Sequence, residues 1–295
     1  MSARRTRRLL LGAHMSIQGG HHRAIARGDA LGCTALQLFT RNNLQWAAPP
    51  LTDDAIARFR DAWHGSSIGP VVAHASYLIN LAATDRAIRR RALDGLILDF
   101  RRAAALGIPW VILHPGNHMG AGEAAGLRQV AGLAARALDA VADLPVGLLL
   151  ENTAGQGTAL GHRFDHLAAL VDSIDVPAVR LGICIDTCHL HAAGHDIRTP
   201  RAYRATLRDL DRTIGLSRLH AIHLNDARGG LGSRLDRHEH IGRGTLGKSA
   251  FRSILRDRRL ARVPKLIETP KKDERRKDWD RVNLRTLRRL LTRDA

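Results

Sequence analysis

Eight short apolar runs recur along the chain, and they alternate with longer segments that have helical spacing of charged and apolar residues. Each run has the length and composition of a strand that is buried on both faces, as in a parallel sheet. The runs cover residues 8–14, 35–39, 71–74, 110–114, 146–151, 181–186, 219–224 and 264–268. Eight strand–helix units within 295 residues predict an α/β protein with a single (β/α)8 TIM barrel.

The segments between the runs have the amphipathic pattern of helices that cover a sheet. The clearest of them cover residues 85–106, 123–141, 166–173, 202–214, 249–255 and 282–291. No stretch rich in proline, glycine and serine divides the sequence, so we expect one barrel domain over residues 9–295. The basic residues 1–8 are expected to form an N-terminal extension outside the barrel.

The chain is strongly basic, with 46 Lys and Arg against 28 Asp and Glu and a formal net charge of +18. Such an excess favours a polyanionic partner, because contacts to phosphates release bound counterions. Only five of the 46 basic residues are lysines. A codon bias toward Arg, Ala, Leu and Gly therefore remains the alternative explanation of the charge.

The cysteines and the apolar segments indicate the cellular compartment of the protein. Three cysteines without a CxxC pair make a disulfide framework improbable and fit a reducing cytoplasm. The apolar run near the N-terminus is too short for a secretion signal. No stretch approaches the length of a membrane span, so we expect a soluble, cytoplasmic protein with no membrane partner.

Most of the eight runs end on, or next to, a residue that can bind a metal ion. These residues are His14, His74, His114, Glu151, Asp186, His223 and Glu268. Active sites of such barrels lie at the carboxyl ends of the strands, so these side chains should converge on one mouth of the barrel. Seven residues at equivalent positions predict a functional site rather than unrelated buried side chains.

Further ligand-type residues follow the sixth and seventh runs. His189 comes three residues after Asp186, and Asp236 and His238 lie two residues apart, so that on extended backbone both face the same way. Cys184 and Cys188 flank Asp186, and we interpret both as small core residues. The candidate ligands are His74, His114, Glu151, Asp186, His189, His223, Asp236, His238 and Glu268.

Nine candidates are more than one ion needs, because a single zinc ion takes three or four protein ligands. The set therefore predicts two or three ions, and imidazole with carboxylate suits zinc, manganese or iron better than calcium. Clustered metal ions stabilise the attacking and leaving oxygens of an in-line phosphoryl displacement. A metal-dependent phosphodiesterase is the reaction class that these residues favour.

Several long motifs resemble signatures of the endonuclease IV family, whose members are apurinic/apyrimidinic DNA endonucleases. The three most specific cover residues 74–82 (HASYLINLA), 182–189 (GICIDTCH) with 192–196 (AAGHD), and 223–226 (HLND) with 232–242 (GSRLDRHEHIG). Residues 39–42 (FTRN) and 151–157 (ENTAGQG) add to them. The resemblance runs from about residue 11 to residue 291, nearly the whole chain.

This resemblance implies a trinuclear zinc site, with manganese as the alternative metal, in which all nine candidates have counterparts. It makes Glu151 the bridge between two ions, and Glu151, Glu268 and His114 the catalytic residues. The other ligands divide into three groups: His74 and His114; Asp186, His223 and Glu268; and His189, Asp236 and His238.

The resemblance also implies a DNA-repair reaction. The enzyme would hydrolyse the phosphodiester 5′ to an abasic site in double-stranded DNA, leaving a 3′-hydroxyl and a 5′-deoxyribose phosphate, and would clear blocked 3′ ends. A monomer is implied. Expected DNA contacts are Arg41, Leu44, Tyr77 and Leu78, the last two on the loop just after His74. Some family members carry an arginine where this chain has Leu44, so gap filling here should depend less on charge.

Two other functions compete with this interpretation. A sugar isomerase or epimerase is one, because related barrels hold metal on histidines and carboxylates, although such enzymes need fewer ligands. A DNA-binding protein without activity is the other. The metal content per chain separates these hypotheses, since about three ions favour the nuclease.

Overall fold

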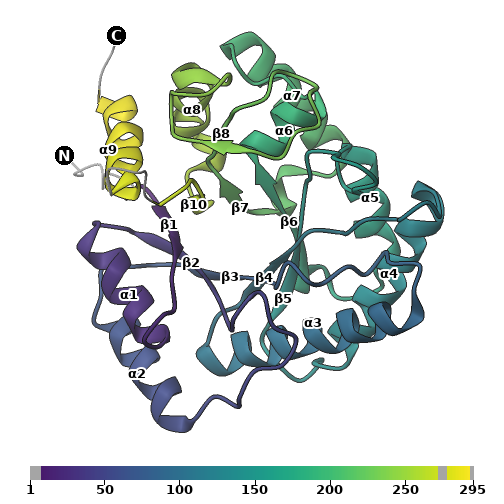
Figure 1. The fold of residues 1–295 in the computed structure, drawn as a ribbon. Coiled ribbons are helices and arrows are strands. Elements are labelled where there is room, and N and C mark those ends of the chain that lie inside the picture. The colour runs from purple at the N-terminus through teal and green to yellow at the C-terminus, as the bar shows by residue number, and fades with distance from the viewer. Residues whose placement is uncertain (1–7, 272–277, 293–295) are drawn as a thin grey trace.

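The eight predicted runs form a closed parallel barrel in the computed structural model, which describes residues 8–271 and 278–292. The strand order around the barrel is β1-β10-β7-β6-β5-β4-β3-β2 (Figure 1). The strands are β1 (Leu11–Met15), β2 (Ala35–Phe39), β3 (Val71–His74), β4 (Trp110–Leu113), β5 (Gly147–Glu151), β6 (Leu181–Asp186), β7 (Leu219–His223) and β10 (Lys265–Ile267). The predicted barrel is confirmed, with strand ends that differ by at most three residues.

Helices surround the barrel on its outside, as Figure 1 shows. They are α1 (His21–Ala30), α2 (Asp53–His64), α3 (Arg86–Leu106), α4 (Glu123–Asp139), α5 (Phe164–Ser173), α6 (Thr187–Ala193), α7 (Pro200–Thr213), α8 (Gly247–Arg256) and α9 (Trp279–Thr292). Three 3-10 turns, Ala178–Arg180, Leu216–Arg218 and Arg258–Leu260, come before β6, β7 and β10. Among the described residues no helix is both long and apolar enough to cross a bilayer.

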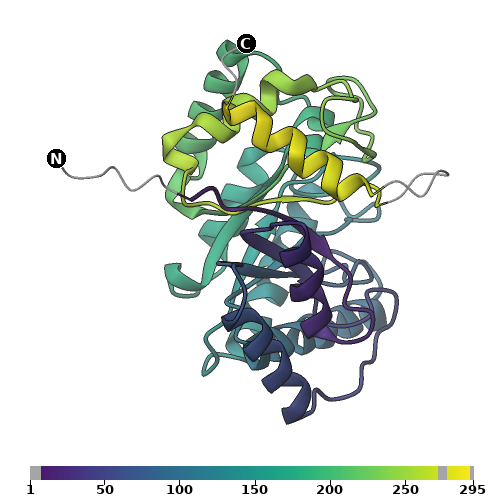
Figure 2. The same cartoon turned by 90° about the vertical axis from the view of Figure 1, so that its left-hand side faces the viewer.

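Side-chain caps fix where several of these helices begin. The Thr52 hydroxyl accepts a hydrogen bond from the Ala55 amide at 3.2 Å, and the Asp85 carboxylate accepts one from the Ile88 amide at 2.9 Å. Each cap satisfies an amide that has no partner within the helix. The last helix, α9, packs against α8 and lies over β1 and β10, where the barrel closes (Figure 2). The predicted extension, residues 1–8, lies outside the described residues except for residue 8.

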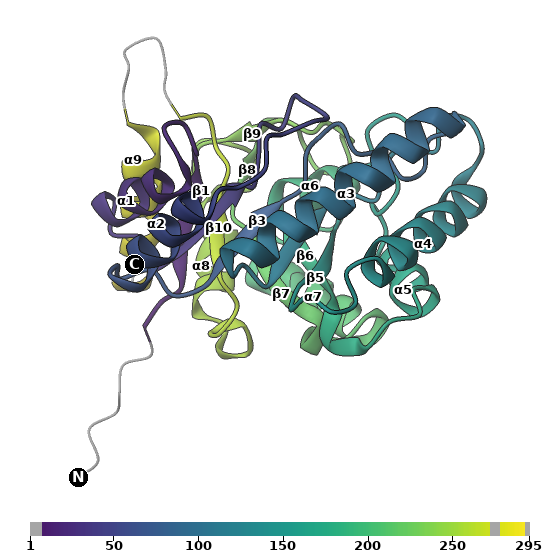
Figure 3. The same ribbon diagram turned by 90° about the horizontal axis from the view of Figure 1, so that it is seen from below.

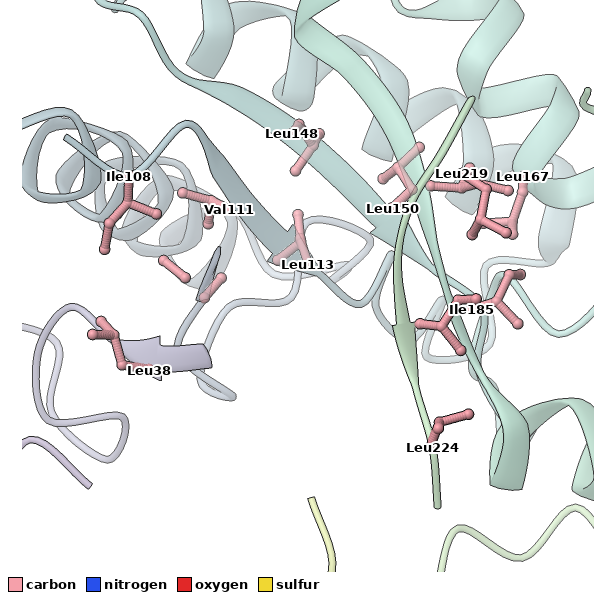
Figure 4. Close-up of a cluster of buried hydrophobic side chains, with 14 of the residues drawn as sticks. Leu38, Ile108, Val111, Leu113, Leu148, Leu150, Leu167, Ile185, Leu219 and Leu224 are labelled. Carbon is pink, nitrogen blue, oxygen red and sulfur yellow. The ribbon is translucent and has the colours of Figure 1, made fainter. Parts of the chain in front are cut away.

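The strand side chains alternate between the barrel interior and the helices. Outward residues such as Leu148, Leu150 and Ile185 pack toward the helices in the main core (Figure 4). Inside the barrel, seven strands each contribute one residue to a separate apolar cluster: Ala35, Val72, Ile112, Leu149, Cys184, Ala221 and Leu266. The eighth strand has Gly12 there, because a Cβ would lie 1.7 Å from the Ala35 carbonyl oxygen.

A two-stranded ribbon follows β7 and folds over the barrel. It consists of β8 (Asp226–Ala227) and β9 (His238–Glu239), paired antiparallel (Figure 3). The loop between them is tied to α6, since the Gly232 amide donates to the His191 carbonyl at 3.0 Å and the Arg234 amide to the Ala192 carbonyl at 2.9 Å. These bonds determine where the predicted Asp236 and His238 lie.

A buried ion pair anchors the loops after β2 and β3. The Arg41 guanidinium donates to the Asp99 carboxylate of α3 at 2.8 Å, and both side chains are 1% exposed. The same carboxylate accepts hydrogen bonds from the Thr40 hydroxyl at 2.8 Å and the Ser76 amide at 3.2 Å. One side chain of α3 thus holds both loops that the sequence predicted to contact DNA.

Removal of this carboxylate should therefore destabilise the fold strongly. Asp99→Ala leaves the Arg41 guanidinium buried without its counter-charge, and we expect the free energy of unfolding to fall by about 3–5 kcal/mol. Urea denaturation measures the change. The matched control is Asp94→Ala on the exposed side of the same helix, which should alter stability by no more than about 0.5 kcal/mol. Equal stability of the two variants would contradict this account of the loops.

Candidate metal centre

A layer of polar side chains lies directly above the apolar cluster inside the barrel. In every strand, the position two residues beyond the apolar cluster, or beyond Gly12 in β1, is polar, and strand alternation turns it inward as well. We call these eight residues the polar layer: His14, Gln37, His74, His114, Glu151, Asp186, His223 and Glu268. The polar layer contains all seven of the strand-end residues that the sequence singled out, together with Gln37.

Glu151 lies at the centre of this layer, with 0% of its side chain exposed. One carboxylate oxygen, Oε2, is 3.3 Å from Nε2 of His74 and 3.2 Å from Nε2 of His114. The other, Oε1, is 2.9 Å from Nδ1 of His223 and 3.4 Å from Nδ1 of His189. Four imidazoles therefore surround one buried carboxylate.

The remaining hydrogen bonds of three histidines indicate which ring nitrogen carries the proton. Nδ1 of His74 donates to the Ala75 carbonyl at 2.7 Å, and Nδ1 of His189 donates to the Asn152 carbonyl at 2.9 Å. Nε2 of His223 donates to the Gln37 side-chain oxygen at 2.7 Å. The other nitrogen of each ring faces a carboxylate oxygen, and it is the nitrogen left for a metal ion when the ring is neutral. Metal-binding histidines have this arrangement, with one nitrogen toward the ion and the other donating to an oxygen.

Among the groups of ligand-type side chains compact enough for a metal ion, two consist wholly of the predicted ligands and share no residue. The ligand atoms of His74, His114 and Glu151 lie within 4.8 Å of one another, and so do those of His189, Asp236 and His238. In the second group Oδ1 of Asp236 is 3.2 Å from Nε2 of His189 and 3.6 Å from Nε2 of His238. Nε2 of His238 is buried and has no hydrogen-bond partner among the described residues. A cation between these atoms would satisfy all three.

Asp186, His223 and Glu268 lie between these two groups. Nδ1 of His223 is 3.1 Å from Oε2 of Glu268 and 3.8 Å from Oδ2 of Asp186. Asp186 also begins α6, because its Oδ1 accepts the His189 amide hydrogen at 3.0 Å. The cap places His189 in the first turn of the helix, beside the polar layer. All nine predicted ligands therefore lie together at one mouth of the barrel, and their donor types fit metal ions.

The close contacts between carboxylates and imidazoles determine the direction of the pKa shifts in the centre. Burial alone would raise the pKa of Glu151, but His223 and His114 hold it well below its ordinary value. Burial would likewise lower the pKa of His223 and His189. Contacts with Cys184, Glu151 and Glu268 raise the pKa of His223 well above 6.5, and Asp186 and Asp236 do the same for His189. The pKa of Asp236 falls to about 2, because His189 and His238 outweigh its burial. The carboxylates are therefore ionised and available to cations.

The cysteines beside the site are protonated core residues in this structure. Burial raises the pKa of the Cys184 and Cys188 thiols to about 12. Cys184 belongs to the apolar cluster below the polar layer, and Cys188 is fully buried in the main core. This agrees with their interpretation from sequence as small core residues.

Another compact group of ligand-type residues, Glu123, His162 and His166, contains none of the nine predicted ligands. Nδ1 of His166 accepts the Gly161 amide hydrogen at 3.3 Å, so Nε2 carries the proton that the Glu123 carboxylate accepts at 3.2 Å. Arg163 donates to the same carboxylate oxygen at 3.2 Å. These bonds complete the group without an ion.

The residues expected to contact DNA have different environments. Leu44 is 72% exposed and Tyr77 is 55% exposed, which is unusual for large apolar side chains. Leu78 is half-buried. Arg41, by contrast, is buried against Asp99 and presents almost no surface to a ligand, so its observed role is to hold the loop that carries Leu44.

The metal centre opens into a pocket of about 390 Å³. His114 and Asp236 line the pocket together with Gly116, Asn117 and Gln156. The Gln156 side-chain oxygen accepts the Asp236 amide hydrogen at 3.1 Å, which ties the loop after β5 to the ribbon. His114, with 32% of its side chain exposed, connects the buried centre to this pocket.

Three amide side chains that contact the predicted ligands were not among the residues predicted from the sequence. Asn152 accepts the Asp186 amide hydrogen at 2.7 Å, and Asn225 donates to the Asp186 carboxylate at 2.6 Å while accepting the Glu268 amide hydrogen at 2.8 Å. Gln37 contacts His14, His223 and Glu268. A signal for Gln37 was present, because it is the single polar residue in the apolar run 35–39.

Comparisons with known proteins agree with this architecture. The family model described as "Xylose isomerase-like TIM barrel" matches residues 25–290. A protein of Geobacter sulfurreducens named "Probable endonuclease 4" is 47% identical over 283 residues, which are 96% of this chain and 95% of that protein. The structure of endonuclease IV from Thermus thermophilus is 36% identical with a TM-score of 0.83, covering 96% of this chain and 98% of that one.

A D-tagatose 3-epimerase-like protein has the same fold at a greater distance. It is 17% identical with a TM-score of 0.70, covering 95% of this chain and 97% of that one. At this identity the likeness concerns the barrel alone and gives no support to an epimerase activity for this chain.

Metal uptake at this centre should release protons. In the metal-free protein the raised pKa of His189 and His223 favours the charged form of both rings, whereas a metal ion requires neutral rings. These charges stabilise the metal-free fold below pH 6.5, and the stabilisation is lost as pH rises through the raised values. Zinc titration calorimetry at pH 7, in buffers of different ionisation enthalpy, should show net proton release and tighter binding at higher pH. Heats that do not depend on the buffer would contradict this electrostatic picture.

Proposed function

The chain belongs to the endonuclease IV family, and on that premise we propose that it is a metal-dependent DNA-repair enzyme that hydrolyses the phosphodiester 5′ to an abasic site. The products are a 3′-hydroxyl and a 5′-deoxyribose phosphate, and the same chemistry clears blocked 3′ ends. The observation that carries the proposal is the convergence of nine ligand-type side chains on the mouth of the barrel, around the buried Glu151.

We propose three zinc ions per chain, with manganese as the alternative. Glu151 would hold two of them, one together with His74 and His114 and the other together with Asp186, His223 and Glu268. His189, Asp236 and His238 would hold the third. Such ions, when bound, stabilise the charge that develops on the oxygens of the phosphate and lower the pKa of bound water.

The protein's own groups prepare the site for this reaction. Both oxygens of the fully buried Glu151 face ring nitrogens of surrounding histidines, and these histidines keep the carboxylate ionised. Glu268 lies 11% exposed across from it, with its pKa also held well below the ordinary range despite burial, by His223 and His14. His114 lies at the pocket, where it can contact the phosphate. Glu151, Glu268 and His114 are therefore the proposed catalytic residues.

The proposed partner is double-stranded DNA, bound by a monomer of this basic chain. A stacked duplex cannot bring its phosphate to a centre inside a barrel mouth, so the abasic nucleotide swings out of the helix. Extrusion costs little there, because the abasic nucleotide has lost its pairing and stacking. The three cysteines are free thiols, which fits work in the reducing cytoplasm.

The reaction is tested with a duplex oligonucleotide that contains one abasic site. Glu151→Ala removes the proposed bridging carboxylate and should lower kcat by several orders of magnitude while DNA affinity changes little. Zinc content per chain, near three in the parent protein, should fall in the same variant. Asp172→Ala, an exposed carboxylate on α5, is the control and should keep full activity. Full activity in Glu151→Ala would overturn the assignment.

We also propose that the loops after β2 and β3 fill the gap left in the duplex. Leu44 and Tyr77 are exposed, and Leu78 directly follows Tyr77 in the loop after β3. We infer that these three side chains act together as an apolar wedge. Apolar wedges commonly separate stacked base pairs. Tyr77 also packs against His74, with ring centroids 5.4 Å apart, which places the wedge within reach of the phosphate site.

A comparison of two substrates separates wedging from packing. Leu44→Ala, Tyr77→Ala and Leu78→Ala should each slow incision of an intact abasic duplex more than removal of a blocked 3′ end at a gap, because a frayed end needs less prying. Thermal unfolding is measured in parallel. Equal losses on both substrates together with a lower Tm would show that these residues only pack their loops.

A further inference from the structure

Gln37 is the one member of the polar layer that cannot ionise, and it is fully buried among residues of four strands. From β2 its carboxamide reaches His14 of β1, His223 of β7 and Glu268, which directly follows β10. These strands are where the first and last parts of the barrel meet. A buried amide in such a place is stable only if its oxygen and both of its N–H groups have partners.

The oxygen and both N–H groups of this amide have hydrogen-bond partners. Oε1 accepts a hydrogen bond from Nε2 of His223 at 2.7 Å. Nε2 donates to Nδ1 of His14 at 2.8 Å and to Oε1 of Glu268 at 2.5 Å. The reversed amide would turn its N–H groups toward His223 and leave its oxygen facing the Glu268 carboxylate. The carboxylate therefore fixes the orientation of the amide.

The orientation of the amide in turn selects the tautomer of His223. An acceptor opposite Nε2 requires that this nitrogen carry the proton, which leaves the lone pair on Nδ1. Nδ1 is the atom that lies 2.9 Å from Glu151 and 3.1 Å from Glu268. The other tautomer would set the lone pair of Nε2 against the Gln37 oxygen and direct a proton into the cation position.

We propose that Gln37 is a positioning residue of the metal centre, which holds His223 in the tautomer that binds metal and fixes the Glu268 carboxylate beside it. This inference rests on the proposed metal-dependent function and extends it to a residue outside the ligand set. The same amide also contacts His14, since its Nε2 lies 2.8 Å from Nδ1 of that ring. Through its oxygen and its N–H groups, Gln37 thereby orients the histidines on either side of it.

Two variants separate the acceptor role of Gln37 toward His223 from its donor role toward Glu268. Gln37→Met keeps the length of the side chain and removes every hydrogen bond. Gln37→Glu keeps the acceptor for His223 but replaces the donors with a carboxylate against Glu268. Gln129→Met, on the partly exposed side of α4, makes the same chemical change away from the centre and serves as the control.

The first measurement is zinc affinity, by competition with a chromophoric chelator. We expect about 10–100-fold weaker binding in Gln37→Met and Gln37→Glu, as is typical when the outer partner of a metal ligand is removed. Gln129→Met should bind as the parent protein does. Affinity in Gln37→Met equal to that of the parent would overturn the proposal.

The second measurement identifies the tautomer directly, from ¹⁵N-detected correlations of the histidine rings in the zinc-loaded protein. His223 should carry its proton on Nε2 in the parent and in Gln37→Glu, and should lose this single state in Gln37→Met. A residue with only a packing role would lower the Tm of the metal-free protein without changing the tautomer, and that result would also overturn the proposal. If the parent itself bound no zinc and cut no abasic DNA, the proposed function would fail instead.

Discussion

A carboxylate with no contact to water stays ionised only if positive charge or hydrogen-bond donors surround it, and Glu151 imposes this condition on the whole mouth of the barrel. Transfer of such a charge from water costs several kcal/mol even after the protein relaxes. Four imidazoles surround the carboxylate and stabilise its charge. They come from β3, β7, the residue after β4 and the first turn of α6. The apolar cluster below the polar layer keeps water from reaching the carboxylate from beneath.

The geometry of parallel strands explains how so many polar groups reach one place. Alternation turns every second residue inward, and the polar layer is the inward position that follows the apolar cluster in each strand. Only His189, Asp236 and His238 come from elsewhere, the first through the cap that Asp186 provides and the other two through the ribbon after β7. The strands therefore position six of the nine predicted ligands. The cap of α6 positions His189, and the ribbon after β7 positions Asp236 and His238.

The sequence predicted the barrel and the strand-end residues because both depend on local periodicity, which is visible without any knowledge of tertiary contacts. The sequence was less informative where contacts with residues far along the chain determine the role of a side chain. Arg41 was expected to contact DNA, but Asp99, 58 residues away, pairs with it below the surface. Gln37 has no ionisable group that would mark it as a ligand in the sequence, and its importance comes from three contacts that only barrel closure creates. Helices α1 and α2 were not singled out, since their mixed polar sequences gain stability from packing on each other.

Closure of the barrel through β1 and β10 also has a consequence for how the protein is made. Glu268 meets His14 and Gln37 across 254 and 231 residues of chain, so no part of a growing polypeptide can hold a complete centre until its last strand has been synthesised. Contacts of such long range are the slowest to form, because a large loop must close first. The nascent chain therefore carries several exposed histidines and carboxylates for most of its synthesis. It gains full capacity for metal only in the final step of folding.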